Sequence, residues 1–484
     1  MSKSKHNKTP LYTALEKYAL EKLTHFDVPG HKKLKALGGI FSNELLAFDA
    51  NSTKELDMLS NPNGIIAEAE GLLAEAYGAD FAFMLVNGST FGVQAMIMAS
   101  VGPKEKIIMP RNVHKSAING VILSGAIPVF IEPEIDYEYG IANGVDYEVV
   151  KKTLKENPDV KAVLLVNPTY FGAISDLKSI ISFCHRKNIA VLVDEAHGAH
   201  FPFGSFLPYS SSYYGADLCT VSMHKTCGSL TQSSILLLNE YHYKRHEIRA
   251  IINLMQTTSA SYLLMASMDL ARKELALNGE KLYDELYDII VEAKAIINNI
   301  NGLSCITSDR IDGKGVFDYD ETKIVVKVNE LGFSGFEVYD ILKNEYNVQM
   351  ELAETYCVLA VVGIGDTRQT IFNLVEALED LSKRYYKKKP PFKVEMAEFF
   401  ERPKTVITPR DAFFTPQRLV KIENAVGEIC GESIMIYPPG IPLIIPGERI
   451  SKNIVKQYWF YVNQNCVMLN DEEDVGFITI LGEA

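Results

Sequence analysis

The sequence predicts an α/β protein built on a mainly parallel sheet of seven strands. Seven short and nearly continuous apolar runs predict these strands, at residues 82–86, 106–110, 127–133, 162–166, 190–194, 218–222 and 234–238. Runs of this kind are typical of strands buried on both faces, as in parallel sheets covered by helices. Before the first run, Ile65, Ala69, Leu72 and Ala76 fall on one face of a helix, and Gly78 is placed to end it.

The rest of the chain predicts further domains around this sheet. We expect an N-terminal segment at 1–62, the large sheet domain at 63–310, a small α/β domain at 311–389 and a C-terminal α+β domain at 390–484. A long helix near 266–299 leads out of the sheet domain, and strands at 323–328 and 358–362 flank a helix near 336–343. Residues 387–391 (KKKPP) predict a linker, because prolines and like charges resist packing.

The composition is that of a globular protein and disfavours several classes of function. The 484 residues are 47% hydrophobic and 23% charged, which excludes a mainly disordered or fibrous chain. A formal net charge of −13 disfavours nucleic-acid binding, which needs a basic face. No apolar run reaches the ~18 residues that cross a membrane, and residues 1–10 show no secretory signal. Seven cysteines without paired spacing favour the reducing cytoplasm.

Polar side chains directly follow the predicted strands and indicate a single site. Open α/β sheets bind their ligands at the carboxyl ends of the strands, so residues placed there are expected to converge. These residues are Gly88-Ser89-Thr90, Asn112-Val113-His114, Asn167-Pro168-Thr169, Asp194 and His224-Lys225.

Lys225 and Asp194 predict the chemistry of this site. A lysine amine condenses with the aldehyde of pyridoxal 5'-phosphate (PLP), and a carboxylate keeps the pyridine nitrogen of PLP protonated, so that the ring withdraws electrons. Lys225 follows Ser222 and His224 in an otherwise uncharged stretch, where a lysine must be partnered or modified because desolvating an ammonium group is costly. The alternatives are a solvated surface lysine and a carboxylate that caps the next turn.

Two segments predict a phosphate site for the cofactor. Ser89 and Thr90 lie between a strand and a helix, where backbone amides, hydroxyls and the helix dipole bind phosphate. A plain helix cap is the alternative. Ser222 and His224 are expected to complete the site from the other side. Neither a Walker motif nor a Gly-x-Gly-x-x-Gly motif follows the early strands, so nucleotide cofactors are unsupported.

Two histidines are predicted to contact the ring of the cofactor. His114 is expected to stack on the pyridine ring, although a loop histidine bonded to backbone is the alternative. His197 is expected to form a hydrogen bond with the phenolic oxygen. The alternative for this segment is a metal site built from His197 and His200 with Glu195, but a ligand set needs further convergent groups and none is evident. We therefore predict no metal.

Together these segments resemble the Orn/Lys/Arg decarboxylase family, bacterial PLP-dependent decarboxylases of basic amino acids with an aspartate-aminotransferase-like fold. The resemblance rests on motifs in family order, at 27–32 (DVPGHK), 87–90 (NGST), 194–200 (DEAHGAH), 222–226 (SMHKT) and 437–442 (YPPGIP), the last followed by PGE at 446–448. It implies Lys225 as the cofactor lysine, Asp194 at the ring nitrogen, His114 on the ring face, and phosphate contacts from Ser89, Thr90, Ser222 and His224.

The resemblance also implies an assembly with shared active sites. Thr258, within 256–262 (QTTSASY), is expected to reach the site of a neighbouring subunit, and Glu448 to receive the distal cation of the substrate. We expect a homodimer or a dimer of dimers. The large inducible members carry an N-terminal wing domain, whereas here the motifs begin at Asp27. Met223 and Cys227 differ from the residues expected beside the lysine, and Val93 stands where many relatives have Asn.

The predicted function is cytoplasmic decarboxylation of a basic L-amino acid, arginine to agmatine or next lysine to cadaverine, as in polyamine biosynthesis. Lys225, His224 and Asp194 are the predicted catalytic residues, with His224 or Lys225 returning the proton to Cα. The alternatives are another PLP-dependent reaction, either an aminotransferase or a lyase, and a non-catalytic regulator. An aminotransferase usually holds the α-carboxylate with an arginine in the small domain, and Arg368 lacks a convincing context for that role.

Overall fold

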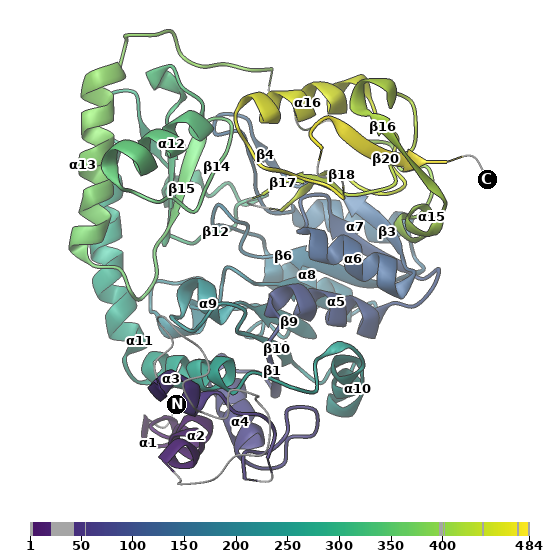
Figure 1. Cartoon of the computed structure of the whole chain (residues 1–484), viewed down its shortest axis with the longest axis vertical. Coiled ribbons are helices and arrows are strands. Elements are labelled where there is room, and N and C mark those ends of the chain that lie inside the picture. Colours follow the sequence, from purple (N-terminus) through teal and green to yellow (C-terminus); the bar gives the residue numbers. More distant parts are fainter. Residues whose placement is uncertain are drawn as a thin grey trace. The chain divides into compact units, whose positions relative to one another are not determined.

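The chain forms two compact units, drawn with all their elements in Figure 1. The computed structural model describes residues 3–20, 43–53, 55–395, 400, 402–437, 440–471 and 474–482. Unit 1 comprises Met1–Ala99, Ala190–Asp284 and Gly363–Gly365, and unit 2 comprises Ser100–Ile189, Glu285–Val362 and Asp366–Ala484. The motif at 27–32, and Pro438 and Pro439 of the motif at 437–442, lie outside the described residues. The domain boundaries expected from the sequence stay a prediction.

The four strands of unit 1 run in the order β1, β10, β9, β8. They are β1 (Phe81–Leu85), β10 (Ser234–Leu238), β9 (Leu218–Val221) and β8 (Ala190–Asp194). Strand β10 is antiparallel to both of its neighbours, whereas β8 and β9 are parallel. All residues of β8 and β10 are buried, as their continuous apolar sequences predict.

Helices surround these strands in unit 1. They are α1 (Lys3–His6), α2 (Pro10–Leu20), α3 (Asn43–Phe48), α4 (Ile65–Tyr77), α5 (Gly88–Ser100), α9 (Met223–Thr226), α10 (Arg245–Met255) and the first part of α11 (Tyr262–Ile297), with a 3₁₀ turn, η1, at Phe201–Phe203. Gly78 ends α4 in a left-handed conformation with a φ of 66°, as predicted. A Cβ atom on Gly92 would lie 2.1 Å from Oγ1 of Thr220, so only glycine lets α5 pack this closely on β9.

Unit 2 contains a parallel set of three strands in the order β6, β2, β3. They are β6 (Val160–Val166), β2 (Lys106–Pro110) and β3 (Ile127–Ile131), and the associated helices are α6 (Lys115–Ser124), α7 (Tyr147–Glu156) and α8 (Leu177–His185). With the strands of unit 1 these make the seven predicted from the sequence. The strand prediction is confirmed, and the described pairings are parallel except those of β10.

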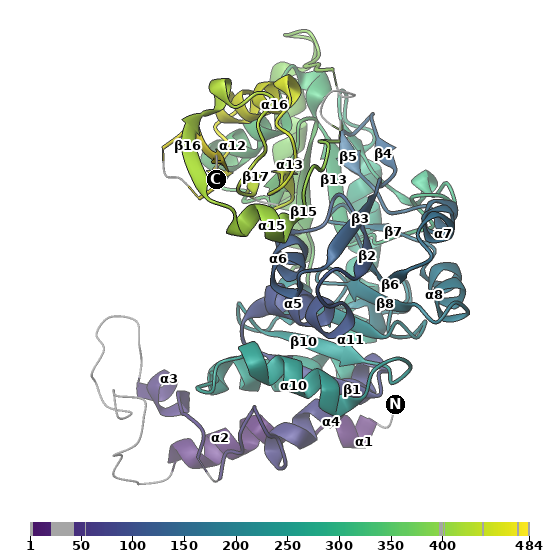
Figure 2. The same cartoon turned by 90° about the vertical axis from the view of Figure 1, so that its right-hand side faces the viewer.

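A second, four-stranded sheet in unit 2 has the order β11, β13, β15, β14 and is entirely antiparallel. Two of its strands, β13 and β15, are labelled in Figure 2. Its strands are β11 (Ser304–Cys305), β13 (Lys323–Lys327), β15 (Cys357–Val361) and β14 (Leu352–Ala353); α12 (Gly335–Tyr346), α13 (Arg368–Tyr385) and the 3₁₀ turns η2 (Ser308–Arg310) and η3 (Asn329–Leu331) accompany them. Short strands pair nearby: β12 (Asp318–Tyr319) with β7 (Ala173–Ile174), and β4 (Ile135–Asp136) with β5 (Ile141–Ala142).

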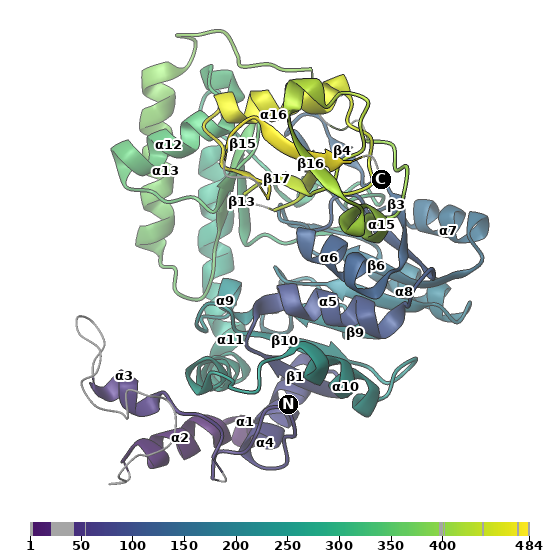
Figure 3. The same ribbon diagram turned by 45° about the vertical axis from the view of Figure 1, so that its right-hand side comes forward.

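The C-terminal part of unit 2 is α+β (Figure 3). It contains α15 (Pro409–Phe414), β16 (Gln417–Lys421), η4 (Ile422–Asn424), β17 (Ile434–Ile436), β18 (Pro442–Ile444), α16 (Lys452–Asn463), β19 (Met468–Leu469) and β20 (Phe477–Leu481). Ile422, Ile434, Ile444 and Tyr458 form its buried core. Among the described residues, no helix combines the length and the apolar character that a membrane crossing needs.

Candidate active site

Lys225 and His197 come together at the carboxyl ends of two adjacent parallel strands in unit 1. Asp194 ends β8 and pairs in register with Thr220 of β9, so the segments that follow these strands start side by side. The Nζ atom of Lys225, in α9, lies 2.7 Å from Nε2 of the buried His197. An ammonium group has no acceptor, so Nε2 of His197 accepts this hydrogen bond. The lysine is therefore partnered within the site.

Asp194 is a buried carboxylate beside this pair. Burial raises the pKa of Asp194, while the charge of Lys225 and the backbone N–H of Ala196, 3.2 Å from Oδ1, both lower it. A carboxylate in such surroundings gains most from a cationic hydrogen-bond donor. Asp194 therefore fits the predicted role of a partner for a protonated pyridine nitrogen.

The carboxylate of Glu195 forms its hydrogen bonds with other groups of the fold. Its carboxylate accepts hydrogen bonds from Oγ of Ser210 at 2.8 Å, from the backbone N–H of Ser211 at 2.9 Å and from the thiol of Cys219 at 3.1 Å. Burial is the main cause that raises the pKa of Glu195 to about 7. His200 packs against the ring of Tyr283, with centroids 5.4 Å apart. Glu195 is thus engaged within the fold, which weakens the alternative of a metal site.

The predicted phosphate-binding residues gather where α5 begins. Oγ of Ser89, in the first turn of α5, lies 2.6 Å from Oγ of Ser222, which precedes α9. Gly88 has a φ of 70°, a conformation that glycine adopts without strain. Nδ1 of His224 donates to the carbonyl of Ser233 at 3.0 Å. Hydroxyls at the start of a 13-residue helix are suited to a phosphate, so this donor set fits the phosphate of PLP.

Thr90 and Thr258 are both exposed. Thr90 lies in the first turn of α5, next to Ser89. Thr258 lies in the loop between α10 and α11, where the N–H of Ser259 donates to Oγ1 of Thr257 at 3.1 Å. The predicted contacts of both threonines with the cofactor stay predictions.

His114 belongs to unit 2, where it caps the start of α6. Its Nδ1 accepts a hydrogen bond from the backbone N–H of Ser116 at 3.1 Å. Gly440, with a φ of 80°, lies against this ring: a Cβ atom there would be 3.1 Å from Nε2 of His114. The N–H of Lys115 also donates to the carbonyl of Gly440 at 3.0 Å. Two sequence motifs more than 300 residues apart thus meet, and the stacking of His114 on the cofactor stays a prediction.

Glu448 is fully buried and forms a two-point ion pair with Arg111. Nη2 of Arg111 lies 2.9 Å from Oε2 of Glu448, and Nε lies 3.2 Å from Oε1. The N–H of Ile445 also donates to Oε2 at 3.0 Å. Both carboxylate oxygens are therefore in use, and the expected contact with a distal substrate cation stays a prediction. Sequence reasoning missed Arg111 as this partner, because no local pattern marks a contact across 337 positions.

Arg368 does not have the setting of a carboxylate-binding arginine. It begins α13, and its Nη1 and Nη2 donate to the two carboxylate oxygens of Glu292 at 2.7 and 2.5 Å. Its side chain is 55% exposed. A guanidinium group that is already paired at the surface is a poor ligand for a substrate α-carboxylate, which disfavours the aminotransferase alternative.

This arrangement fits the class of aspartate-aminotransferase-like PLP enzymes: a lysine follows one buried strand, a carboxylate ends the parallel neighbour, and hydroxyls lie at a helix start. The chain matches the family model "Orn/Lys/Arg decarboxylase, major domain" over residues 9–370 and "Orn/Lys/Arg decarboxylase, C-terminal domain" over residues 392–467. The chain therefore belongs to the Orn/Lys/Arg decarboxylase family, and the resemblance seen in the sequence is confirmed.

Comparison of the chain with individual proteins gives the same family. The chain is 41% identical over 450 residues to the arginine decarboxylase of Bacillus subtilis (strain 168), covering 92% of each chain. It is 42% identical over 457 residues to the arginine decarboxylase of Halalkalibacterium halodurans, covering 93% of this chain and 92% of the relative. The crystal structure of the lysine decarboxylase LdcF of Francisella novicida shares the fold, with a TM-score of 0.83 and 18% identity over 98% of this chain and 81% of that chain.

Proposed function

We propose that this chain decarboxylates a basic L-amino acid with PLP as cofactor, and that it prefers L-arginine over L-lysine. The observation that carries the proposal is the Lys225 amine, 2.7 Å from His197 and close enough to the buried Asp194 for its charge to lower the pKa of that carboxyl. Two relatives of about 40% identity that are named arginine decarboxylases support arginine as the substrate.

Each residue has a role that follows from its surroundings. When bound, PLP draws away the electron pair that remains at Cα after carbon dioxide leaves. Asp194 would supply the buried negative charge that keeps the ring nitrogen protonated, and Ser89, Ser222 and His224 would hold the phosphate. His114 is proposed to cover the ring face.

Lys225 and His197 are also placed to transfer a proton. Lys225 would hold PLP through its amine, and this amine lies beside Nε2 of His197. Nε2 of His197 can accept a proton from Nζ, and Nζ can carry a proton to Cα once carbon dioxide has gone. His224 is the other candidate donor. Its Nδ1 donates to the carbonyl of Ser233.

The proposal extends to assembly and cellular role. We propose a homodimer, or a dimer of dimers, in which the exposed loop carrying Thr258 completes the neighbouring site. We propose that the enzyme acts in the cytoplasm. We also propose a role in polyamine biosynthesis, because decarboxylated arginine is a guanidino amine. Light scattering that gives the mass of one chain would contradict the shared site.

The activity is tested directly by supplying the PLP-loaded protein with arginine, lysine and ornithine in separate reactions and measuring carbon dioxide and amine release. We expect release from arginine first, abolished in Lys225→Ala and retained in Lys244→Ala, a matched change at an exposed lysine of unit 1. If none of the three releases carbon dioxide although the visible absorbance of lysine-bound PLP is present, the decarboxylase proposal fails and another PLP reaction replaces it.

A further inference from the structure

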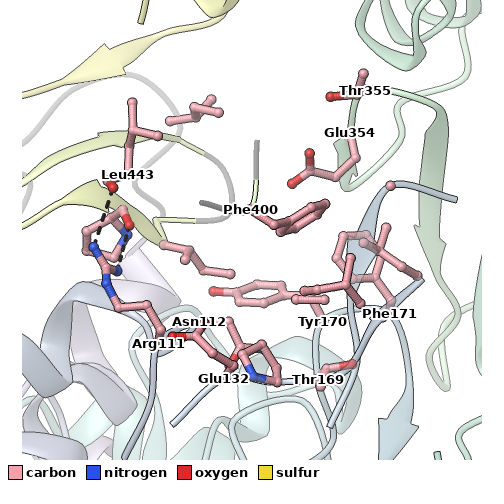
Figure 4. A pocket seen from close by; sticks show the side chains of 18 of the residues that line it. Arg111, Asn112, Glu132, Thr169, Tyr170, Phe171, Glu354, Thr355, Phe400 and Leu443 are labelled. Carbon is pink, nitrogen blue, oxygen red and sulfur yellow. Dashed lines mark hydrogen bonds between the residues drawn. The ribbon is translucent and has the colours of Figure 1, made fainter. Parts of the chain in front are cut away.

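Unit 2 contains a cavity of about 170 Å³ whose lining includes Asn112 and Thr169 but none of the residues given a role in the proposed PLP chemistry. Segments far apart in the sequence build its walls, and Figure 4 shows the side chains that line it. Tyr170, Phe171, Phe400 and Tyr461 supply aromatic rings, and Glu354 supplies a carboxylate. In Figure 4 the carboxylate of Glu354 points into the cavity, on the side opposite Arg111. The cavity is therefore aromatic with a single acid at one end.

The fold holds Glu354 firmly in this position. Glu354 lies in the turn between β14 and β15, where its N–H donates to the carbonyl of Cys357 at 2.8 Å. The first residue of α12, Gly335, packs on this turn so closely that a Cβ atom would be 2.1 Å from the carbonyl oxygen of Glu354. The N–H of Gly335 also donates to the carbonyl of Thr355 at 3.1 Å. The turn is thus held by its own hydrogen bond and by α12, and these contacts fix the backbone that carries the Glu354 carboxylate.

Glu354 has no cationic partner within the part of the chain that the structure describes. None of the ion pairs among those residues includes Glu354, and the hydrogen bond that lowers its pKa comes from the backbone N–H of Thr355. Burial is the larger effect and raises the pKa of Glu354 to about 7. Residues 396–399 and 401, which flank Phe400 in the sequence, include no lysine or arginine.

The two arginines that line the same cavity are each paired with another acid. Arg111 binds the buried Glu448, with Nη2 2.9 Å from Oε2, and Nη1 of Arg402 lies 3.3 Å from Oε1 of Glu132. Both guanidinium groups also lie over the ring of Phe130, at 5.7 and 5.4 Å from its centroid. The cavity therefore presents balanced charges on one side and an uncompensated acid, Glu354, on the other.

An organic cation satisfies both features of this cavity. Its charge compensates the carboxylate, which burial otherwise penalises, and its positive head group is attracted to the faces of aromatic rings. A bare metal ion is disfavoured, because hard cations need several converging oxygen ligands and Glu354 is the one acid at its end of the cavity. An anionic ligand would meet an unpaired carboxylate, which disfavours it as well.

We propose that the Glu354 cavity binds an aliphatic amine or guanidinium compound through a charge-assisted hydrogen bond to the Glu354 carboxylate, with the chain of the ligand against Tyr170 and Phe400. The binding site stands apart from the proposed function: it needs neither Lys225 nor PLP. Agmatine is a suitable probe because it carries both kinds of head group. Pentylamine tests the ammonium group alone, and pentanol is its uncharged control.

Titration calorimetry of the PLP-loaded protein tests the site with two matched variants. Glu354→Gln removes the charge and keeps the shape, whereas Glu351→Gln makes the same change at an exposed position just before the same turn. We expect agmatine and pentylamine to lose about tenfold or more in affinity at one class of site in Glu354→Gln, and to be unaffected in Glu351→Gln. Tyr170→Leu should weaken the same class, which keeps the test valid if Glu354→Gln folds poorly.

Several outcomes would overturn the site. They are equal affinities in wild type and Glu354→Gln, pentanol binding as tightly as pentylamine, or an equal loss in Glu351→Gln. Lys225→Ala separates this inference from the proposed function. If that variant loses carbon dioxide release but keeps the Glu354-dependent class of sites, both hold. If the wild type releases no carbon dioxide and the Glu354-dependent class is present, only the decarboxylase proposal fails.

Discussion

The amine of Lys225 and Nε2 of His197 lie 2.7 Å apart, and this contact couples the proposed cofactor lysine to a buried imidazole. The two residues follow adjacent parallel strands, so the sheet itself sets their separation. We expect a histidine in this position to orient the lysine amine and to accept its proton. We therefore expect His197 to position Lys225, in addition to its predicted hydrogen bond with the phenolic oxygen.

Replacing His197 by alanine should lower kcat by roughly ten- to hundredfold, because a hydrogen bond to a charged group is worth about 1.5–3 kcal/mol. His197→Gln keeps a side-chain acceptor and should recover part of the loss. The pH titration of the visible absorbance of lysine-bound PLP should shift in the alanine variant, which a purely structural role would not cause. An unchanged titration and kcat in His197→Ala would remove the residue from this role.

Ser89 and Ser222 should together determine PLP affinity. Their hydroxyl oxygens lie 2.6 Å apart at the start of α5, and we expect both to donate to the phosphate when PLP is bound. The double change Ser89→Ala with Ser222→Ala should weaken PLP binding by about tenfold or more, measured by equilibrium dialysis. Ser205→Ala, at a serine of unit 1 that donates to Asp284, is the matched control and should bind PLP normally. Equal affinities in all three proteins would place the phosphate elsewhere.

The sequence alone predicted the strands well because their pattern is local. The predicted bounds of β2, β8 and β10 coincide with those of the structure, and each is a nearly continuous apolar run. The motifs around Lys225 and Asp194 were equally visible, because each directly follows or ends a predicted strand, and strand ends are where such a sheet binds its ligands. These features depend only on neighbours in the chain.

Contacts between distant segments could not be predicted in the same way. Arg111 pairs with Glu448 across 337 positions, and no periodicity or motif connects them. Glu354 stands in an ordinary strand-turn sequence, and only the folded chain brings Tyr170 and Tyr461 to its cavity. The acid at 195 was visible beside Asp194, but its role depends on Ser210 and Cys219, which the fold brings to it.

Glu195 should make stability depend on pH near neutrality. Burial raises its folded-state pKa from the ordinary 4.5 to about 7, so the folded protein retains a proton that the unfolded chain releases between these values. The stabilisation from the neutral carboxyl is complete below about pH 4.5 and is lost as the pH rises through about 7. Glu195→Gln removes this dependence.

The size of the effect follows from the shift in pKa. Relative to wild type, Glu195→Gln should gain about 3 kcal/mol of unfolding free energy between about pH 4 and about pH 8, to order of magnitude. Thermal unfolding of both proteins across this range measures it. Glu240→Gln, at a half-buried acid of unit 1 whose pKa is lowered, is the control and should show no such gain. Parallel pH profiles for wild type and Glu195→Gln would show that the carboxyl does not titrate in this range.

The ion pair between Arg111 and Glu448 should contribute more to the stability of the fold than to substrate binding. Both side chains are buried, so Glu448→Gln leaves the guanidinium group without its counter-charge and should cost about 3–5 kcal/mol of unfolding free energy. Glu132→Gln breaks the neighbouring exposed pair with Arg402 and should cost about 0–1 kcal/mol. Chemical denaturation of the three proteins compares these values, and the KM for arginine is measured in parallel. A large rise in KM with unchanged stability in Glu448→Gln would instead assign the carboxylate to the distal cation of the substrate, because an acid held by Arg111 cannot be removed without destabilising the fold.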